Sequence, residues 1–264
     1  MKKGIIILSL LIAHSTMGQR VLHDLLATSP GVDGRQAEMR IENWIDHLKS
    51  KSTTSDIQLL RRVFIETHRK FLKNYSQYSD MSEVFTSEKY DCLTATSLYS
   101  IVLDGLDFDY NIIETNYHIF IVVNTSHGEV LLETTDRWNG FVTDSKKINQ
   151  RIGNYKLNTV AALPTKDKKF YLYQLNLFHR IQQNQLPGLL YFNQAVKAYN
   201  AGDWEQCSTL LDKAQVIYSS PRIAELTLIL IESVKNSILD EDKKKNLLDR
   251  YEDANLYNQT IASR

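Results

Sequence analysis

The sequence predicts an α+β fold in which helices precede and follow a short block of antiparallel strands. Over most of the chain, apolar residues recur at three- and four-residue spacing, which is typical of helices with one buried face. Between residues 110 and 134, β-branched and aromatic residues instead flank a turn-forming segment. Gly and Pro number only 10 and 4 among 264 residues, so we expect long helices and few tight turns.

The composition indicates a globular protein. Hydrophobic residues make up 43% of the chain and charged residues 23%, which excludes a disordered chain or a polytopic membrane protein. The 31 Lys and Arg residues are balanced by 31 Asp and Glu residues. Because nucleic-acid-binding domains carry a basic excess, we expect no nucleic acid partner.

The first eighteen residues are typical of a secretory signal peptide. Lys2 and Lys3 precede an apolar stretch over residues 4–13, and small residues before Gln19 suit cleavage there. This stretch is too short to span a bilayer, which needs about 20 residues. We expect residues 1–18 to be removed on export to a bacterial periplasm or the cell exterior. The alternative is an uncleaved N-terminal segment, which would provide the only membrane contact.

Two amphipathic helices are expected in the N-terminal part, over residues 36–48 and 57–72. Ser55 begins the second helix, and His68 falls on its polar side, where we expect a solvated side chain. Residues 75–90 are polar, irregular and rich in Ser and Tyr, which indicates a loop.

The central block begins with an apolar helix over residues 92–103, with Asp91 and Cys92 at its N-terminus. Three strands are expected to follow, over residues 110–115, 117–123 and 129–134. The last two form a β-hairpin. A turn centred near residues 125–126 would place Glu133 directly opposite His118, on the same face of the sheet.

The C-terminal part is predicted to be helical. A weak helix is expected at 145–151, a domain boundary near residue 165, and helices from residue 170 to the end. We therefore expect one domain over residues 19–165 and a helical region over 166–264. Several residues in this region resemble a tetratricopeptide repeat unit in their spacing: Ala195, Gly202, Trp204, Cys207, Leu211 and Ala214. A plain helical hairpin is the alternative to a repeat unit. Pro221 begins the next helix. The whole helical region is a candidate surface for binding a protein partner.

One group of residues has the order needed for thiol chemistry. Cys92 opens a helix, His118 lies on a strand 26 residues later, and Glu133 lies on the paired strand 15 residues after that. A helix N-terminus stabilises a thiolate, and a neighbouring imidazole exchanges the proton with it. A carboxylate on the adjacent strand would orient the imidazole. Asp136 is the alternative acid.

This order resembles the core of the transglutaminase-like superfamily of papain-fold cysteine enzymes. The matching segments are YDCLTATSLYSIVL (90–103), YHIFIVV (117–123) and EVLLETTD (129–136). The resemblance implies a helix packed on an antiparallel sheet, with Cys92 as nucleophile, His118 as base and Glu133 as orienting acid. It implies no metal and no organic cofactor.

The sequence also departs from the family pattern. Leu93 follows the Cys, where animal crosslinking enzymes carry Trp, and Thr86 stands near the position where papain-like enzymes have the oxyanion-hole Gln. The backbone N–H of Cys92, with Tyr90 or a loop hydroxyl, would have to serve instead. Trp138 is a candidate for lining a substrate groove, although a packing role is equally consistent.

Two functions follow from these residues. The first is an exported cysteine hydrolase acting on an amide bond of a peptide or protein. The second is an inactive relative that serves as a binding or scaffold module through its helical region. Three other roles stay open for Cys92: a buried small hydrophobe, a disulfide with Cys207, and a zinc ligand together with His118 and Glu133.

Overall fold

The computed structural model describes residues 20–29, 33–51, 55–116, 118–157 and 178–262. The chain divides into two compact units, Met1–Leu190 and Tyr191–Arg264. The predicted signal peptide and the predicted boundary near residue 165 both lie outside the described residues. Among the residues that are described, no helix is long and apolar enough to cross a membrane.

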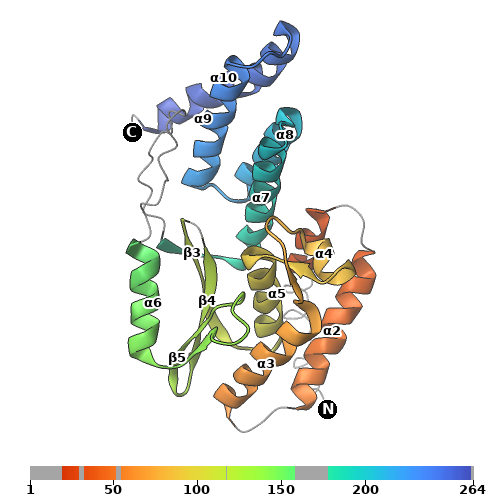
Figure 1. The fold of residues 1–264 in the computed structure, drawn as a ribbon, viewed down its shortest axis with the longest axis vertical. Coiled ribbons are helices and arrows are strands. Elements are labelled where there is room, and N and C mark those ends of the chain that lie inside the picture. The colour runs from red at the N-terminus through yellow and green to blue at the C-terminus, as the bar shows by residue number, and fades with distance from the viewer. Residues whose placement is uncertain (1–19, 30–32, 52–54, 117, 158–177, 263–264) are drawn as a thin grey trace, which may run out of the picture. The chain divides into compact units, whose positions relative to one another are not determined.

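The first unit is built on a five-stranded antiparallel sheet (Figure 1). Its strand order is β6-β5-β4-β3-β7, with every neighbouring pair antiparallel. The strands are β3 (Asp109–Thr115), β4 (Ile119–Thr125), β5 (Gly128–Leu132), β6 (Phe141–Val142) and β7 (Phe178–Ile181). The fold is therefore α+β, as the sequence predicted. The strand β7 contradicts the prediction that the chain is helical from residue 170 onward.

Helices cover both faces of this sheet, which gives the first unit a layered arrangement (Figure 1). On one face, alternate apolar residues such as Phe120, Val122 and Leu131 pack against Ile148 of α6 (Ser145–Leu157). On the other face lies α5 (Cys92–Gly105), which contacts β3 and β4. Every residue of α5 from 93 to 103 is buried, because its sequence consists of apolar and small residues all round.

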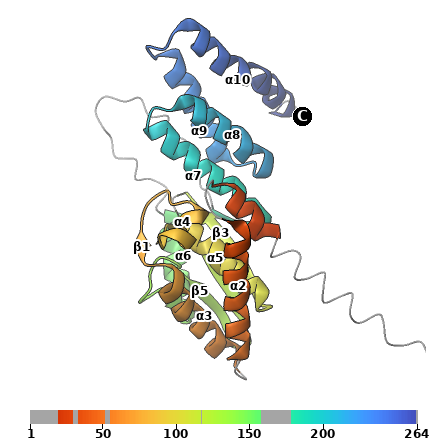
Figure 2. The same cartoon turned by 90° about the vertical axis from the view of Figure 1, so that its right-hand side faces the viewer.

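Two long helices, α2 (Gly34–Ser50) and α3 (Asp56–Phe71), pack on the outer side of α5 (Figure 2). Both were predicted from their apolar periodicity, with ends that differ by a few residues. Gly105 allows the close approach of α2, since a Cβ there would lie 2.6 Å from a methyl group of Ile45. The Trp44 indole joins the two outer helices by donating to the Thr67 hydroxyl at 3.0 Å.

The segment predicted as a loop over residues 75–90 is in fact ordered. It contains α4 (Met81–Thr86) and a two-residue parallel pairing of β1 (Asn74–Tyr75) with β2 (Lys89–Tyr90). The helix is started by a capping box in which the Asp80 carboxylate accepts from the Glu83 amide at 3.0 Å. Elements this short have no apolar periodicity, which is why the sequence pattern did not predict them.

The prediction for His68 was wrong: the side chain is 3% exposed. Its ring lies edge-on to the Tyr90 ring, with centroids 5.5 Å apart. Neither ring nitrogen has a hydrogen-bond partner among the described residues. Burial, assisted by the charge of Arg137, lowers the pKa of His68 below its usual 6.5. The helix-face pattern of α3 failed here because Tyr90, from a short element that the pattern missed, covers this side.

Replacing His68 by leucine is expected to stabilise the protein by about 1 kcal/mol, because it removes two unpaired polar atoms from the interior. The wild type should also lose stability as the pH falls below 6.5, since the unfolded chain binds a proton that folded His68 does not. The advantage of the variant should therefore grow between pH 7.5 and pH 5 in urea unfolding. A variant less stable than wild type at pH 7.5 would contradict this account.

The second unit is helical (Figure 2). It contains the residues of α7 (Leu186–Asn200) from Tyr191 onward, followed by α8 (Trp204–Ile217), α9 (Pro221–Lys235) and α10 (Glu241–Ala262). Within this unit, α9 packs against both α8 and α10. Gly202 turns the chain between α7 and α8 with φ +77°, and Pro221 begins α9, as the sequence indicated. Cys207 is fully buried.

A second helical hairpin, α9 with α10, follows the first. The sequence did not indicate it as a repeat, because Ser237 and Leu239 occupy the places that correspond to Gly202 and Trp204. The separation between the starts of α7 and α9, at Leu186 and Pro221, is nevertheless close to the period of tetratricopeptide units, which is about 34 residues.

Candidate active site

Cys92 is placed by the cap of α5. Asp91 is the N-cap residue, and its carboxylate accepts from the Thr94 amide at 2.8 Å. The Thr94 hydroxyl in turn accepts from the Asp91 amide at 2.8 Å, which completes a capping box. Cys92 is therefore the first helical residue, half-buried, with its own N–H in the first turn, where no intrahelical acceptor exists.

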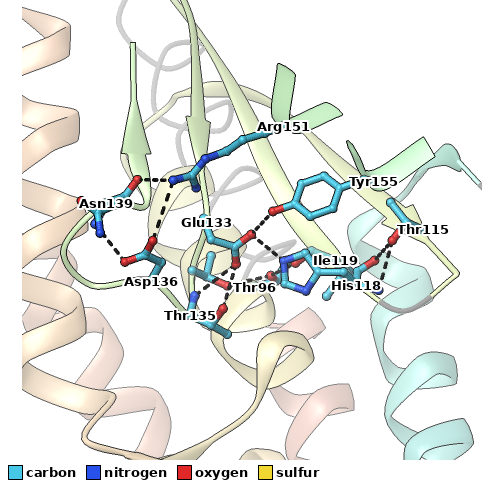
Figure 3. Close-up of polar contacts among 11 residues, drawn as sticks. Thr96, Thr115, His118, Ile119, Glu133, Thr135, Asp136, Asn139, Arg151 and Tyr155 are labelled. Carbon is cyan, nitrogen blue, oxygen red and sulfur yellow. Dashed lines mark hydrogen bonds and ion pairs between the residues drawn. The ribbon is translucent and has the colours of Figure 1, made fainter. Parts of the chain in front are cut away.

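The backbone of His118, immediately before β4, is held in place by Thr115. Its carbonyl accepts from the Thr115 amide at 2.8 Å and from the Thr115 hydroxyl at 2.9 Å. The His118 amide donates back to that hydroxyl at 3.1 Å (Figure 3). The end of β3 thus fixes the main chain from which the imidazole projects.

The register of the hairpin differs from the one that the sequence favoured. Thr125 pairs with Gly128 and Ile121 with Leu132, so the turn is centred one residue later than expected. Continuing this register places Glu133 opposite Phe120, two residues from His118. Because side chains alternate with a period of two, the two-residue offset leaves Glu133 and His118 on one face of the sheet.

The side chains of Glu133 and His118 are in contact despite this two-residue offset. Nε2 of His118 lies 2.6 Å from Oε2 of Glu133 (Figure 3). Glu133 is 5% exposed and accepts two further hydrogen bonds from side chains, from the Tyr155 hydroxyl at 2.7 Å and the Thr135 hydroxyl at 2.8 Å. Its two carboxylate oxygens are therefore both occupied, which leaves the acid a single orientation.

Tyr155 is a site residue that the sequence analysis missed. It belongs to α6, beyond the residue where that helix was expected to end. Its ring packs against His118 and Phe120, with centroids 5.3 and 5.0 Å away. A helical pattern carried past residue 151 would have placed Tyr155 on the same face as Ile148 and Ile152, which pack on the sheet.

The loop after Glu133 folds back on the acid through backbone hydrogen bonds. The Glu133 amide donates to the Gly140 carbonyl at 2.8 Å, and the Gly140 amide donates to the Asp136 carbonyl at 2.8 Å. A Cβ at position 140 would lie 2.2 Å from the Glu133 carbonyl oxygen and 2.3 Å from that of Asp136. Only glycine fits this turn.

The sulfur of Cys92 completes the site, because the Cys92 side chain lies near enough to His118 to raise the pKa of its ring. Since Glu133 occupies Nε2, Nδ1 is the ring nitrogen available to the sulfur. Burial alone would lower the pKa of His118, but the hydrogen bonds and negative charges of Cys92 and Glu133 outweigh it and raise that pKa to about 10.

The acid is shifted in the complementary direction. Burial would raise the pKa of Glu133, but its hydrogen bonds and the positive charge of His118 outweigh burial and lower it. At neutral pH the site therefore holds an imidazolium between a carboxylate and a sulfur.

The other residues proposed from the sequence lie in different settings. Asp136 accepts from the amides of Trp138 and Asn139 at 3.2 and 2.9 Å and pairs with Arg151 at 3.8 Å, so Glu133 is the acid that contacts His118 (Figure 3). Trp138 is 83% exposed and lies under the Arg137 guanidinium.

The two residues proposed for the oxyanion hole also differ in exposure. Tyr90 is buried. Thr86 is exposed at the end of α4, where its hydroxyl donates to the Ser82 carbonyl at 3.0 Å.

Both cysteines are free thiols, so the disulfide alternative is wrong. Within the part of the chain that the structure describes, no group of three or more His, Cys, Asp or Glu side chains is arranged to hold a metal ion.

The sequence matches no protein-family model, and no curated protein resembles it significantly. The assignment of a function therefore depends on the geometry of this site.

Proposed function

We propose that the protein is an exported cysteine hydrolase with a transglutaminase-like core that cleaves an amide bond in a peptide or protein. One observation carries the proposal. The His118 ring interacts with the Cys92 side chain and hydrogen-bonds through Nε2, at 2.6 Å, to the buried carboxylate of Glu133. Nucleophile, base and orienting acid thus form one connected group.

The reaction follows from the charges in this group. The Cys92 thiolate attacks the carbonyl carbon, and the carbonyl oxygen becomes an oxyanion. When the C–N bond breaks, His118 gives its proton to the leaving amine, and a thioester to Cys92 remains. Water then attacks the thioester while neutral His118 takes one of its protons. The C–S bond breaks, the carboxylic acid leaves, and the thiolate–imidazolium pair is restored without a metal or organic cofactor.

The transglutaminase-like part of the proposal is supported by connectivity. Cys92 opens a buried helix, His118 precedes a central strand of the antiparallel sheet, and Glu133 follows the neighbouring strand. This is the order of elements that the three sequence segments resemble. Export is proposed from the sequence of residues 1–18, which lie outside the described part of the chain.

The site favours a hydrolase over an inactive scaffold. A scaffold would tolerate a sulfur buried under side chains, yet Cys92 is half-buried whereas Cys207 is fully buried. Burial also raises the pKa of Cys207 to about 12, so that this second thiol stays protonated. The second unit has exposed apolar residues, including Val216 and Leu228, and we keep the prediction that a protein partner binds there.

The test is the rate at which iodoacetamide alkylates Cys92 between pH 5 and pH 9, followed by mass spectrometry of the peptide. We expect a fast reaction at pH 6 that rises little at higher pH, because only thiolates react and the ion pair supplies one. In His118→Ala the rate at pH 6 should fall at least about ten-fold and then rise with pH, as for an ordinary thiol.

A matched histidine provides the control. His179 pairs with Glu114 at 3.4 Å on β7 and β3, so His179→Ala removes a histidine–carboxylate pair that includes neither Cys92 nor His118 and should leave the rate unchanged. Cys207 is an internal reference that should react only on unfolding. If Cys92 in the folded wild type reacts no faster at pH 6 than it does in His118→Ala, the hydrolase proposal is wrong.

A further inference from the structure

Tyr75 lies beside the short strand that leads into Cys92. The pairing of β1 with β2 aligns Tyr75 with Tyr90, which precedes Cys92 by two residues. The Ser76 amide donates to the Tyr90 carbonyl at 2.8 Å, and the Asn74 amide donates to the Glu88 carbonyl at 3.0 Å. The backbone around Tyr75 is therefore tied to the segment that leads into the nucleophile.

The side chain of Tyr75 is accessible from solvent. It is 59% exposed, although its ring rests edge-on against that of Tyr90 with centroids 5.8 Å apart. Partial burial and the negative charges of Cys92 and Asp91 raise the pKa of Tyr75. Its hydroxyl therefore keeps its proton at neutral pH.

The alternatives for a hydroxyl donor are less well placed. The Tyr90 ring is buried against the rings of His68 and Tyr75. The Thr86 hydroxyl is used within its own helix. Tyr75 alone among these three combines an exposed ring with a backbone fixed to the approach of Cys92.

We propose that the Tyr75 hydroxyl is the side-chain donor of the oxyanion hole, acting together with the backbone N–H of Cys92. This inference rests on the proposed function, because it concerns the acyl transfer performed by Cys92. When the thiolate attacks, the carbonyl oxygen gains a negative charge, and the protonated phenol of Tyr75 donates a hydrogen bond to it. The bond strengthens as the charge develops, so it accelerates acylation and not the ionisation of the thiol.

Two reagents separate these effects in the variant Tyr75→Phe. Alkylation by iodoacetamide proceeds without a tetrahedral oxyanion, whereas acylation by p-nitrophenyl acetate passes through one. We expect Tyr75→Phe to alkylate at the wild-type rate at pH 6 and to acylate about 10–100-fold more slowly. Acylation is followed by the burst of p-nitrophenolate, with Cys92→Ala measuring the background.

Each outcome bears on a different claim. Slow alkylation of the wild type at pH 6 would contradict the proposed function itself. Normal alkylation with an unchanged acylation rate in Tyr75→Phe would overturn the role of Tyr75. An equal loss of both rates would also overturn it, because Tyr75 would then act on the thiol. The matched variant Tyr90→Phe should keep both rates, and a selective loss of acylation there would assign the donor to Tyr90.

Discussion

Replacing Glu133 by glutamine is expected to slow the alkylation of Cys92 at pH 6 by about 100-fold. The amide carries no charge to balance the His118 imidazolium, so the ring loses its proton and no longer supports the thiolate. In serine-protease triads the corresponding change costs about 10⁴ in rate. We expect a smaller loss because a thiol ionises more readily than a serine hydroxyl.

The same variant should change the dependence of stability on pH. His118 has an unfolded pKa near 6.5 and a folded pKa of about 10, so its contribution is complete below pH 6.5 and is lost as the pH rises toward 10. The folded pKa of Glu133 is lowered, so its contribution is lost as the pH falls below its unfolded value. In Glu133→Gln both slopes should flatten, as measured by urea unfolding between pH 4 and pH 10.

The neighbouring acid provides the control for this prediction. Asp136→Asn removes a carboxylate close in sequence that binds backbone amides and Arg151. Its alkylation rate at pH 6 should equal that of the wild type. If Asp136→Asn slowed the reaction as much as Glu133→Gln did, Asp136 would have to be considered the orienting acid after all.

Replacing Gly140 by alanine is expected to cost about 3 kcal/mol of unfolding free energy, the largest stability effect of a single methyl group that we foresee. The added Cβ would lie 2.2 Å and 2.3 Å from the carbonyl oxygens of Glu133 and Asp136, and 2.9 Å from the Phe64 ring. Two of these atoms are backbone, so relief requires breaking the hydrogen bonds that hold the loop. The displaced Glu133 should also slow the alkylation of Cys92.

Gly153 provides a matched glycine within α6. A Cβ there meets nothing within 4 Å, so Gly153→Ala should stabilise the protein by about 0.5–1 kcal/mol through helix propensity. Thermal and urea unfolding of both variants would measure the difference. A Gly140→Ala protein as stable as the wild type would show that the loop has room to relax and that Glu133 is held mainly by Tyr155 and Thr135.

The sequence by itself determined the order of the candidate catalytic residues along the chain and most of the helices and strands that carry them. The apolar helix over 92–103 and the hairpin with His118 and Glu133 on one face could be predicted. Glu133 and His118 lie on one face although the register differs from the expected one by two residues, because side chains on a strand alternate with a period of two. A shift of one residue would have separated the pair.

Only the tertiary structure decided which further groups surround the pair. Tyr155 reaches Glu133 because α6 packs across the sheet. The pairing of β1 with β2 brings Tyr75 next to Tyr90, two residues before Cys92. The tertiary structure also buries His68, for which the helical pattern had predicted a solvated side chain. The physical reason is the same in each case. Periodicity reports which face of one element is buried, whereas contacts between distant elements depend on packing that leaves no local signal.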